Sequence, residues 1–318
     1  MKRSSVHNAA VDIRHVLAVP IALLNALTCR GMHFMGTAVP VVVKIEELRH
    51  FIRARRQEGK SVGLTPTMGA LHAGHLSLVE ILRQHVDCVI VTIFVNPTQF
   101  SVNEDFGRYP RQLTQDLEKL LAVKADLVFA PSVEEMYPSD FSTRVIITGP
   151  AQVNLEDRFR PTHFEGVATV VAKLLNQAQA DVAIFGEKDY QQLQVIRRLA
   201  RDLDLSTRIL AGPTLRDADG LALSSRNVYL SSDERAKAPQ LYLALRSAAS
   251  QILKGVEICE ALKQSREIIV KAGMQIDYLE ARHAESLTPL KSLVEGPARL
   301  LVAAHLGKTR LIDNIAVS

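Results

Sequence analysis

The chain has 318 residues, of which 47% are hydrophobic and 23% are charged, with 16 glycines, 13 prolines and no tryptophan. Apolar residues are plentiful and glycine and proline occur at ordinary levels, so the composition excludes a disordered, collagen-like or coiled-coil protein. No apolar run reaches the roughly 18–20 residues that a membrane-spanning helix needs, and we expect no membrane partner. The length suits one large α/β domain or two domains of ordinary size.

The formal net charge of +4 lies almost entirely at the N-terminus. Residues 1–40 hold four basic side chains and one acidic side chain, which gives +3, and the rest of the chain is nearly neutral. The charge therefore gives no reason to expect nucleic acid as a partner. The three cysteines, Cys29, Cys88 and Cys259, are widely spaced and odd in number, which favours a reducing compartment over a disulfide framework.

Residues 1–38 are predicted to be an N-terminal extension without a catalytic role. The apolar stretch 16–27 behind Arg14 resembles the core of a signal peptide, but residues 28–31 offer no clean cleavage site. We expect either a disordered extension or a start codon placed too early.

Helical and strand patterns alternate from residue 41 onward. A helix is predicted from about residue 45, and a short strand over 61–65 that we expect Pro66 to end. A helix with an apolar stripe follows, and the run 87–95 is typical of a strand buried on both faces because it is nearly all apolar and β-branched.

Three more strands are predicted over 126–130, 181–185 and 206–210, each preceded by a helix. The helices include residues 113–120, 166–178 and 193–203. This alternation predicts an α/β fold with a parallel sheet covered by helices on both faces, and ligands in such sheets bind at the carboxyl ends of the strands.

The pattern changes after Pro213, where a helix-rich stretch over 233–272 precedes strands at 276–281 and 298–304. We therefore predict domains over 39–213 and 214–318, the second a smaller α+β domain. Residues 59–61 and 307–309 look like the end of a phosphate-binding P-loop, but both lack the second glycine that this loop needs five residues earlier.

Residues 65–75 follow the first predicted strand and lead into a helix. Free N–H groups and the helix dipole favour an anion there, and Gly69 and Gly74 allow the backbone to approach a bulky group closely. His72 and His75 are spaced so that both imidazoles can donate hydrogen bonds to one phosphoryl group. A zinc site is the alternative, although no cysteine or carboxylate stands nearby to complete it.

Three further polar segments lie where the predicted fold places the same site. Asn96 and Gln99 follow the second core strand and offer neutral hydrogen-bonding groups, although this segment could be only a capped loop. Residues 186–189 follow a later strand, and in them Lys188 could neutralise phosphate charge while a carboxylate holds Mg²⁺ directly or through water. Residues 222–227 bring two serines and an arginine that could close on a triphosphate. A helix-capping turn is the alternative for each of the last two.

In this order and spacing, PTMGALHAGH, FVNPTQF, FGEKDYQQ and LALSSRN resemble the pantoate–β-alanine ligase family. That family lies within the nucleotidyltransferase superfamily marked by a His-x-Gly-His signature, and the resemblance runs from about residue 41 to the C-terminus. It implies an ATP-dependent ligase that condenses (R)-pantoate with β-alanine through pantoyl adenylate, releasing AMP and diphosphate with Mg²⁺. It also implies a cytoplasmic homodimer built from a Rossmann-like domain and a C-terminal lid domain.

The resemblance assigns roles to individual positions. The catalytic residues that it implies are His75, as proton donor, with His72, Lys188 and Arg226. The ATP-binding residues that it implies are Met68, Gly69, Ala70, Leu71, His72, Ala73, Gly74, His75, Gly186, Glu187, Lys188, Asp189, Leu215, Leu223, Ser224, Ser225 and Arg226. The residues that it implies in binding pantoate and β-alanine are Gln99 and Gln192, and we expect Asn96 to join them as a neutral hydrogen-bonding group for the substrate. Either Asp116 or Asp189 is the implied magnesium ligand.

Two other functions suit parts of the pattern. A nucleotidyltransferase acting on a phosphate-bearing acceptor should bind that acceptor through several basic residues, whereas the neutral Gln99 and Gln192 suit a small hydroxy acid better. A non-catalytic nucleotide sensor would bind ATP without turnover, and the presence of His72, His75 and Lys188 speaks against it.

Overall fold

The structure is a computed structural model that describes residues 38–317 except 101–103 and 105. Almost all of the predicted extension at residues 1–38 lies outside the described residues. Residues 38–318 form one compact unit, and the domain boundary that we expect near Pro213 stays a prediction.

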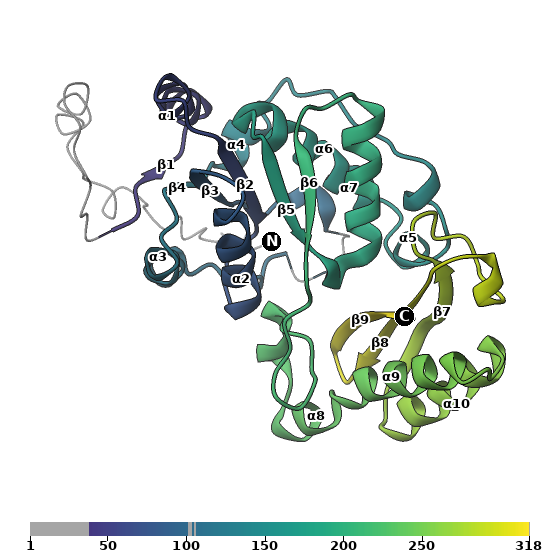
Figure 1. Ribbon diagram of the computed structural model, residues 1–318. Helices are drawn as coiled ribbons and strands as arrows, with labels where there is room; N and C mark the ends of the chain where they lie inside the picture. The colour runs from purple at the N-terminus through teal and green to yellow at the C-terminus, as the bar shows by residue number, and fades with distance from the viewer. Residues whose placement is uncertain (1–37, 101–103, 105, 318) are drawn as a thin grey trace, which may run out of the picture. The chain divides into compact units, whose positions relative to one another are not determined.

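Within the described residues, six parallel strands form one sheet in the order β1-β4-β3-β2-β5-β6 (Figure 1). The strands are β1 (Val41–Val42), β2 (Val62–Thr67), β3 (Cys88–Ile93), β4 (Leu127–Phe129), β5 (Val182–Gly186) and β6 (Arg208–Gly212). The predicted α/β class with a Rossmann-like parallel sheet is confirmed. The last strand begins two residues later than the predicted 206–210.

We expected Pro66 to end β2, but the strand continues through it to Thr67. Thr67 turns its backbone toward β3, because its carbonyl accepts the N–H of Phe94, so the alternating pattern turns Pro66 toward β5. The pairing of β2 with β5 ends at Leu64. The missing N–H of Pro66 therefore costs no hydrogen bond of the sheet.

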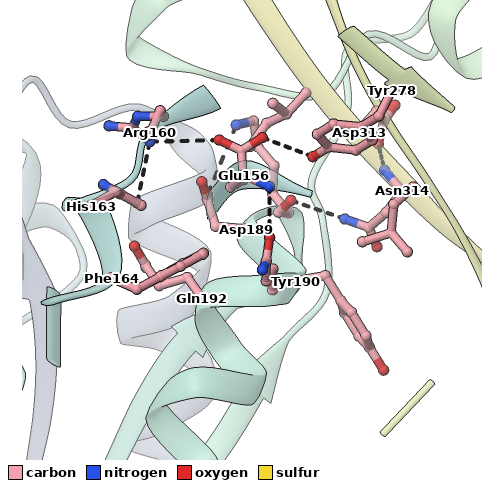
Figure 2. A pocket seen from close by; sticks show the side chains of 14 residues that line it. Glu156, Arg160, His163, Phe164, Asp189, Tyr190, Gln192, Tyr278, Asp313 and Asn314 are labelled. Atoms are coloured by element: carbon pink, nitrogen blue, oxygen red, sulfur yellow. Dashed lines mark hydrogen bonds and ion pairs between the residues drawn. The ribbon is translucent and has the colours of Figure 1, made fainter. Parts of the chain in front are cut away.

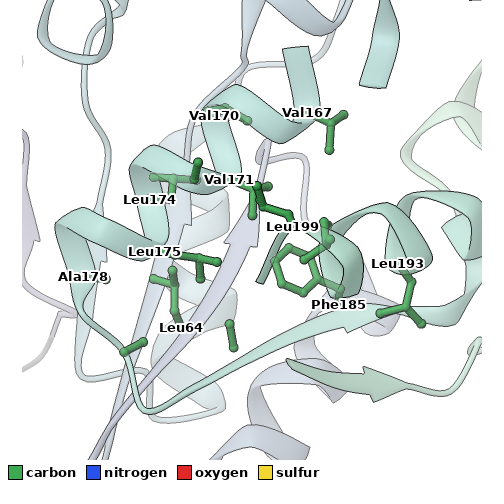
Figure 3. Packing of buried hydrophobic residues seen from close by; sticks show 14 of the residues in the cluster. Leu64, Val167, Val170, Val171, Leu174, Leu175, Ala178, Phe185, Leu193 and Leu199 are labelled. Atoms are coloured by element: carbon green, nitrogen blue, oxygen red, sulfur yellow. The ribbon is translucent and has the colours of Figure 1, made fainter. Parts of the chain in front are cut away.

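Helices cover both faces of this sheet. The helices of this part of the chain are α1 (Ile45–Gln57), α2 (Ala73–Arg83), α3 (Leu113–Ala122), α4 (Val133–Met136), α5 (Glu156–Phe159), α6 (His163–Ala178) and α7 (Tyr190–Asp202), with 3-10 turns at η4 (Pro97–Gln99), η5 (Gly149–Ala151) and η6 (Glu187–Asp189). Helices α1, α6 and α7 share one hydrophobic cluster with the sheet, and α2 and α3 share another. Figure 3 shows the first cluster, in which Val167, Val171 and Leu175 of α6 gather with Leu64 and Phe185 of the sheet.

The C-terminal part has a separate antiparallel sheet in the order β7-β8-β9 and its own hydrophobic cluster. Its elements are β7 (Gln275–His283), β8 (Ala298–Leu306), β9 (Thr309–Val317), α8 (Ser232–Lys237), α9 (Gln240–Leu253), α10 (Ile258–Lys271), η7 (Ser225–Tyr229) and η8 (Leu293–Glu295). Strand β9 was not predicted. Gly307, at φ 57°, and Lys308 form the two-residue turn between Leu306 and Thr309, so the P-loop-like residues are a hairpin turn.

Candidate active site

The order of the strands places the predicted segments at one edge of the parallel sheet. Successive connections run from β2 to β3 and β4 on one side, and from β5 to β6 on the other. Ligands in open α/β sheets bind at the carboxyl ends of the strands where this order reverses, which here lies between β2 and β5. The segments that follow β2, β3 and β5 hold the two histidines, Asn96 with Gln99, and Lys188 with Asp189.

The loop between β2 and α2 has a tightly fixed backbone. Gly69 and Ala70 both have positive φ, at 80° and 51°. A side chain on Gly69 would meet Asp116 Oδ2 at 3.1 Å, so a glycine suits this position both for its conformation and for its space. The N–H groups of Ala70 and Leu71 donate to the two carboxylate oxygens of Asp116, at 2.9 and 2.8 Å.

Asp116 acts as an anchor for this loop. Its side chain is 1% exposed, and the neighbouring Lys119 reaches the Leu71 carbonyl at 2.7 Å. Both carboxylate oxygens already accept backbone N–H groups, and this anchoring role was not predicted from the sequence. The carboxylate gives partners to the N–H groups of Ala70 and Leu71, and so stabilises a loop in which Ala70 has an unfavourable positive φ.

The two histidines lie against each other at the start of α2, with their ring planes tilted by 38°. Their ring centroids are 4.1 Å apart. His72 caps the helix, since its Nδ1 accepts the N–H of Gly74, and His75 Nδ1 accepts the N–H of His72. In both neutral rings the proton is therefore on Nε2, which is left to act as a hydrogen-bond donor.

Burial keeps both imidazoles neutral. It lowers the pKa of His72 to about 4, with a further contribution from the positive charge of Lys188. It lowers the pKa of His75 to about 3, with further contributions from His72 and Lys188. At neutral pH the pair thus presents uncharged N–H donors, and Lys188 supplies the positive charge beside them.

Side chains from the three strand ends line a cavity of about 180 Å³. The predicted site residues that line it are Met68, His75, Asn96, Gln99, Asp189, Gln192 and Arg226. Figure 2 shows a smaller cavity of about 20 Å³, also lined by Asp189 and Gln192 and by the predicted Lys188. The structure thus brings His75 and Arg226 to one cavity although they are distant in sequence.

The remaining predicted ATP residues line neither of these two cavities. They are Gly69, Ala70, Leu71, His72, Ala73, Gly74, Gly186, Glu187, Leu215, Leu223, Ser224 and Ser225. Leu223 lies over Gly74 and donates its N–H to the Leu215 carbonyl at 3.0 Å, and Ser225 Oγ lies 3.4 Å from the Ala70 carbonyl. The segment around Arg226 is thereby held against the loop that carries the histidines.

Sequence reasoning missed two cavity-lining residues, Arg160 and His163, which precede and begin α6. Burial, and then the charge of Arg160, lowers the pKa of His163 to about 4. The neutral ring donates from Nδ1 to the Gln99 carbonyl at 2.9 Å, and its Nε2 accepts from Arg160 at 3.2 Å. Arg160 also binds the Glu104 carboxylate through Nε at 2.7 Å. The signal that could have found them is a basic pair, three residues apart, at the start of a helix whose interior is apolar.

The described residues hold no group of three or more histidine, cysteine or carboxylate side chains arranged to bind a metal ion. The zinc alternative for His72 and His75 therefore gains no support. Among the helices of the described part, none is long and apolar enough to cross a membrane. Cys88 and Cys259, the two cysteines of that part, form no disulfide.

Comparison with known proteins decides the family. The model of the pantoate-beta-alanine ligase family matches residues 40–316. The chain belongs to this family.

Relatives share nearly their whole length with the chain. A pantothenate synthetase from Rhodopseudomonas palustris is 54% identical over 279 residues, which are 87% of this chain and 99% of the relative. Another from a Bradyrhizobium species is 53% identical over 89% of this chain and 100% of the relative. The crystal structure of a Thermus thermophilus pantothenate synthetase superposes with a TM-score of 0.84 at 46% identity, covering 88% of this chain and 99% of that one.

A pantoate-beta-alanine ligase from Francisella tularensis, solved in complex with beta-gamma ATP and beta-alanine, also has this fold. It superposes with a TM-score of 0.72 at 34% identity and covers 88% of this chain and 98% of its own. The predicted family and the predicted enzyme class, a ligase of pantothenate biosynthesis, are confirmed. The roles of individual residues stay predictions.

Proposed function

We propose that the chain joins (R)-pantoate to β-alanine with ATP, through pantoyl adenylate, and releases AMP and diphosphate. The observation that carries this proposal is the single cavity lined by His75, Gln99, Gln192 and Arg226, at the edge of the sheet where ligands bind. The complex of the Francisella tularensis relative supports ATP and β-alanine as substrates.

In the first step the pantoate carboxylate attacks the α-phosphorus of ATP and diphosphate leaves. A carboxylate is a poor acylating agent, and adenylation gives it a good leaving group. The protein therefore needs to position the reactants and to stabilise charge rather than to supply a nucleophile. The Nε2–H groups of His72 and His75 donate to phosphoryl oxygens, and Lys188 and Arg226 offset the negative charge. The amides of Gln99, Gln192 and Asn96 orient pantoate.

His75 enters this step as a neutral hydrogen-bond donor. With a pKa of about 3 it carries no extra proton at neutral pH in the protein alone. A bound triphosphate would bring negative charge to the ring and raise that pKa, because an anion favours the protonated form. The family's assignment of this histidine as proton donor then applies to the complex with nucleotide.

Asp189 suits the magnesium ion better than Asp116. Mg²⁺ in such sites usually takes one or two carboxylates, with phosphates and water completing its shell. The Asp189 side chain is 49% exposed and lines the cavity, 3.9 Å from Lys188 Nζ. Asp116 is buried with both oxygens engaged by backbone N–H groups. The ion, held by Asp189 directly or through water, would offset charge on the triphosphate.

In the second step the β-alanine amine attacks the acyl carbon of pantoyl adenylate and AMP leaves. The intermediate is prone to hydrolysis, so water must be kept from it. The segment from Leu223 to Arg226 belongs to the C-terminal part and lies over Gly74, so it can cover the nucleotide. This is the role that we give to a C-terminal lid over residues 214–318.

The assembly that we infer is a cytoplasmic homodimer that binds neither nucleic acid nor membrane. Segment 142–148 supports a second copy of the chain as partner, because it is rich in β-branched residues and belongs to no strand of the described residues. Ile146 in this segment is 69% exposed. An exposed segment of this composition is suited to forming a strand against another chain.

A coupled assay of AMP release tests the proposed function. With ATP and Mg²⁺ present, release of AMP should require both pantoate and β-alanine, and pantoate alone should support exchange of labelled diphosphate into ATP. Release of AMP without pantoate, or ATP binding without any turnover, would contradict the proposal.

A further inference from the structure

Hydrogen bonds from the buried Asn314 side chain link the turn that carries Lys188 to the C-terminal sheet. Asn314 of β9 is 3% exposed. Its Nδ2 donates to the backbone carbonyls of Glu187 and Lys188, at 2.9 Å each. Figure 2 shows Asn314 reaching from the yellow sheet toward the turn before Tyr190. The two N–H groups of the Asn314 amide therefore fix the peptide group before Lys188 and the peptide group after it.

The amide is itself held in this orientation. Asn314 Oδ1 accepts from Arg299 Nε at 2.7 Å, and Arg299 is a diagonal neighbour of Asn314 on the adjacent strand β8. Arg299 Nη2 lies 3.2 Å from the Glu187 carboxylate, and its guanidinium lies 4.0 Å from the ring centroid of Tyr190. Arg299 thus fixes which end of the Asn314 amide faces the turn, since guanidinium only donates.

From these contacts we infer that Asn314 is a positioning residue for Lys188, with Arg299 orienting its amide. Under the proposed function, on which this role rests, the C-terminal sheet helps to hold the ATP site in place. Asn314 lines the smaller cavity together with Lys188 but not the larger cavity of His75 and Arg226, and the hydrogen bonds of its amide to the turn go to the backbone. A domain movement that separated the two sheets would have to break both hydrogen bonds to the turn.

The test compares Asn314→Asp and Asn314→Ala with two controls in the full chain. Aspartate keeps the shape of the Asn314 side chain but removes both of its N–H donors. Alanine removes the same donors without adding a negative charge. Asn176→Asp makes the same chemical change on α6, where the amide donates only to the Ala172 carbonyl of its own helix. Ile315→Val removes one methyl group from the neighbouring position of β9. It therefore controls for a loss of stability of the C-terminal sheet that leaves the hydrogen bonds to the turn intact.

We expect both Asn314 variants to lower kcat/KM for ATP in the pantoate-dependent diphosphate exchange by roughly tenfold to a hundredfold, as misplacing a catalytic group does. The KM for β-alanine should stay unchanged, and both controls should behave as wild type. In a Lys188→Ala background the Asn314→Ala change should have almost no further effect, because residues that act through one group are not additive.

A second measurement separates this inference from the proposed function. Backbone amides of residues 186–192 should exchange with deuterium faster in Asn314→Ala than in Ile315→Val at equal overall stability. If wild type forms no AMP, the proposed function fails and this exchange still decides the inference. Wild-type kinetics in folded Asn314→Ala, equal exchange in the two variants, or a full additional loss in the Lys188→Ala background would each overturn it.

Discussion

At the scale of single residues, burial keeps the imidazoles of His72 and His75 neutral, which suits the role in phosphoryl chemistry that we propose for them. A charged imidazole would hold ATP tightly but would also be costly to bury, whereas a neutral one offers its N–H at little cost. Because Nδ1 of each ring accepts a backbone N–H, the remaining proton stands on Nε2. The local backbone of α2 thereby sets the tautomer that the reaction needs.

The variant His75→Ala tests that role. We expect it to lower the rate of adenylate formation by about 100-fold or more, the effect of losing one preorganised donor. The free energy of unfolding should change little, because the ring lines a cavity and its own hydrogen bond is long, at 3.4 Å. Single-turnover formation of AMP and urea unfolding give the two quantities. His85→Ala, an exposed histidine just beyond the same helix, is the control, and near-normal turnover in folded His75→Ala would contradict the assignment.

The sequence predicts His72 and His75 but not Arg160 and His163, and the reason is physical. The first pair stands in a glycine-flanked turn after a buried strand, where an anion site is the expected use of free N–H groups. The second pair acts through Gln99, a contact that is 64 residues distant in sequence. A local sequence pattern cannot show that residues so far apart in the chain are in contact.

At the scale of elements, helix α6 and turn η4 fit together through a missing side chain. A Cβ on Gly166 would lie 2.3 Å from the Thr98 carbonyl oxygen and 2.7 Å from the Gln99 nitrogen. Asn96 Nδ2 donates to the Gly166 carbonyl at 3.2 Å. The start of α6 therefore packs directly against η4, the turn that we propose orients pantoate.

Gly166→Ala should therefore raise the KM for pantoate by roughly tenfold and leave that for ATP nearly unchanged, because a displacement of about 1 Å affects the substrate that the turn positions. Alanine ordinarily stabilises a helix interior by about 1 kcal/mol relative to glycine, so a loss of stability here would also report the clash. Steady-state kinetics with each substrate varied in turn measures the effect. Gly107→Ala, where nothing lies within 4 Å of the new Cβ, is the matched control, and equal KM values for pantoate in the two variants would refute the role of Gly166.

Helices and strands with a clear apolar pattern in the sequence were predictable. Elements whose form depends on contacts with distant parts of the chain were not. The run that forms β3 is buried along its whole length apart from Ile93, and its composition alone predicts a strand. Strand β9 mixes Arg310, Asp313 and Asn314 with apolar residues, because these polar side chains bind other parts of the molecule. The continuation of β2 through Pro66 depends on where its pairing with β5 stops, which no local pattern records.

At the scale of the whole described part, a buried ion pair joins the two sheets. Glu156 of α5 is 7% exposed, and its oxygens accept from Arg310 of β9 at 2.8 and 2.9 Å and from Tyr278 of β7 at 2.8 Å. Burial alone would raise the pKa of Glu156, but the bonds and charge of Arg310 outweigh it and lower that pKa to about 2. The carboxylate is therefore ionised throughout the neutral range, and Figure 2 shows it between the two parts.

Glu156→Gln keeps the shape of this link and removes its charge. Arg310, whose side chain is 20% exposed, then loses Glu156 but keeps the Asp277 carboxylate at 2.7 Å, so we expect the free energy of unfolding to fall by about 2 kcal/mol, the scale of a lost hydrogen bond to a charged group. Because Glu156 links α5 to the C-terminal sheet, we expect calorimetry to show the C-terminal part of the variant melting before the parallel sheet, and the wild type melting in one transition. Asp202→Asn, which weakens the exposed pair with Arg201, should change stability by less than about 1 kcal/mol. A Glu156→Gln protein that unfolds at the wild-type temperature in one transition would show that apolar contacts alone hold the two sheets together.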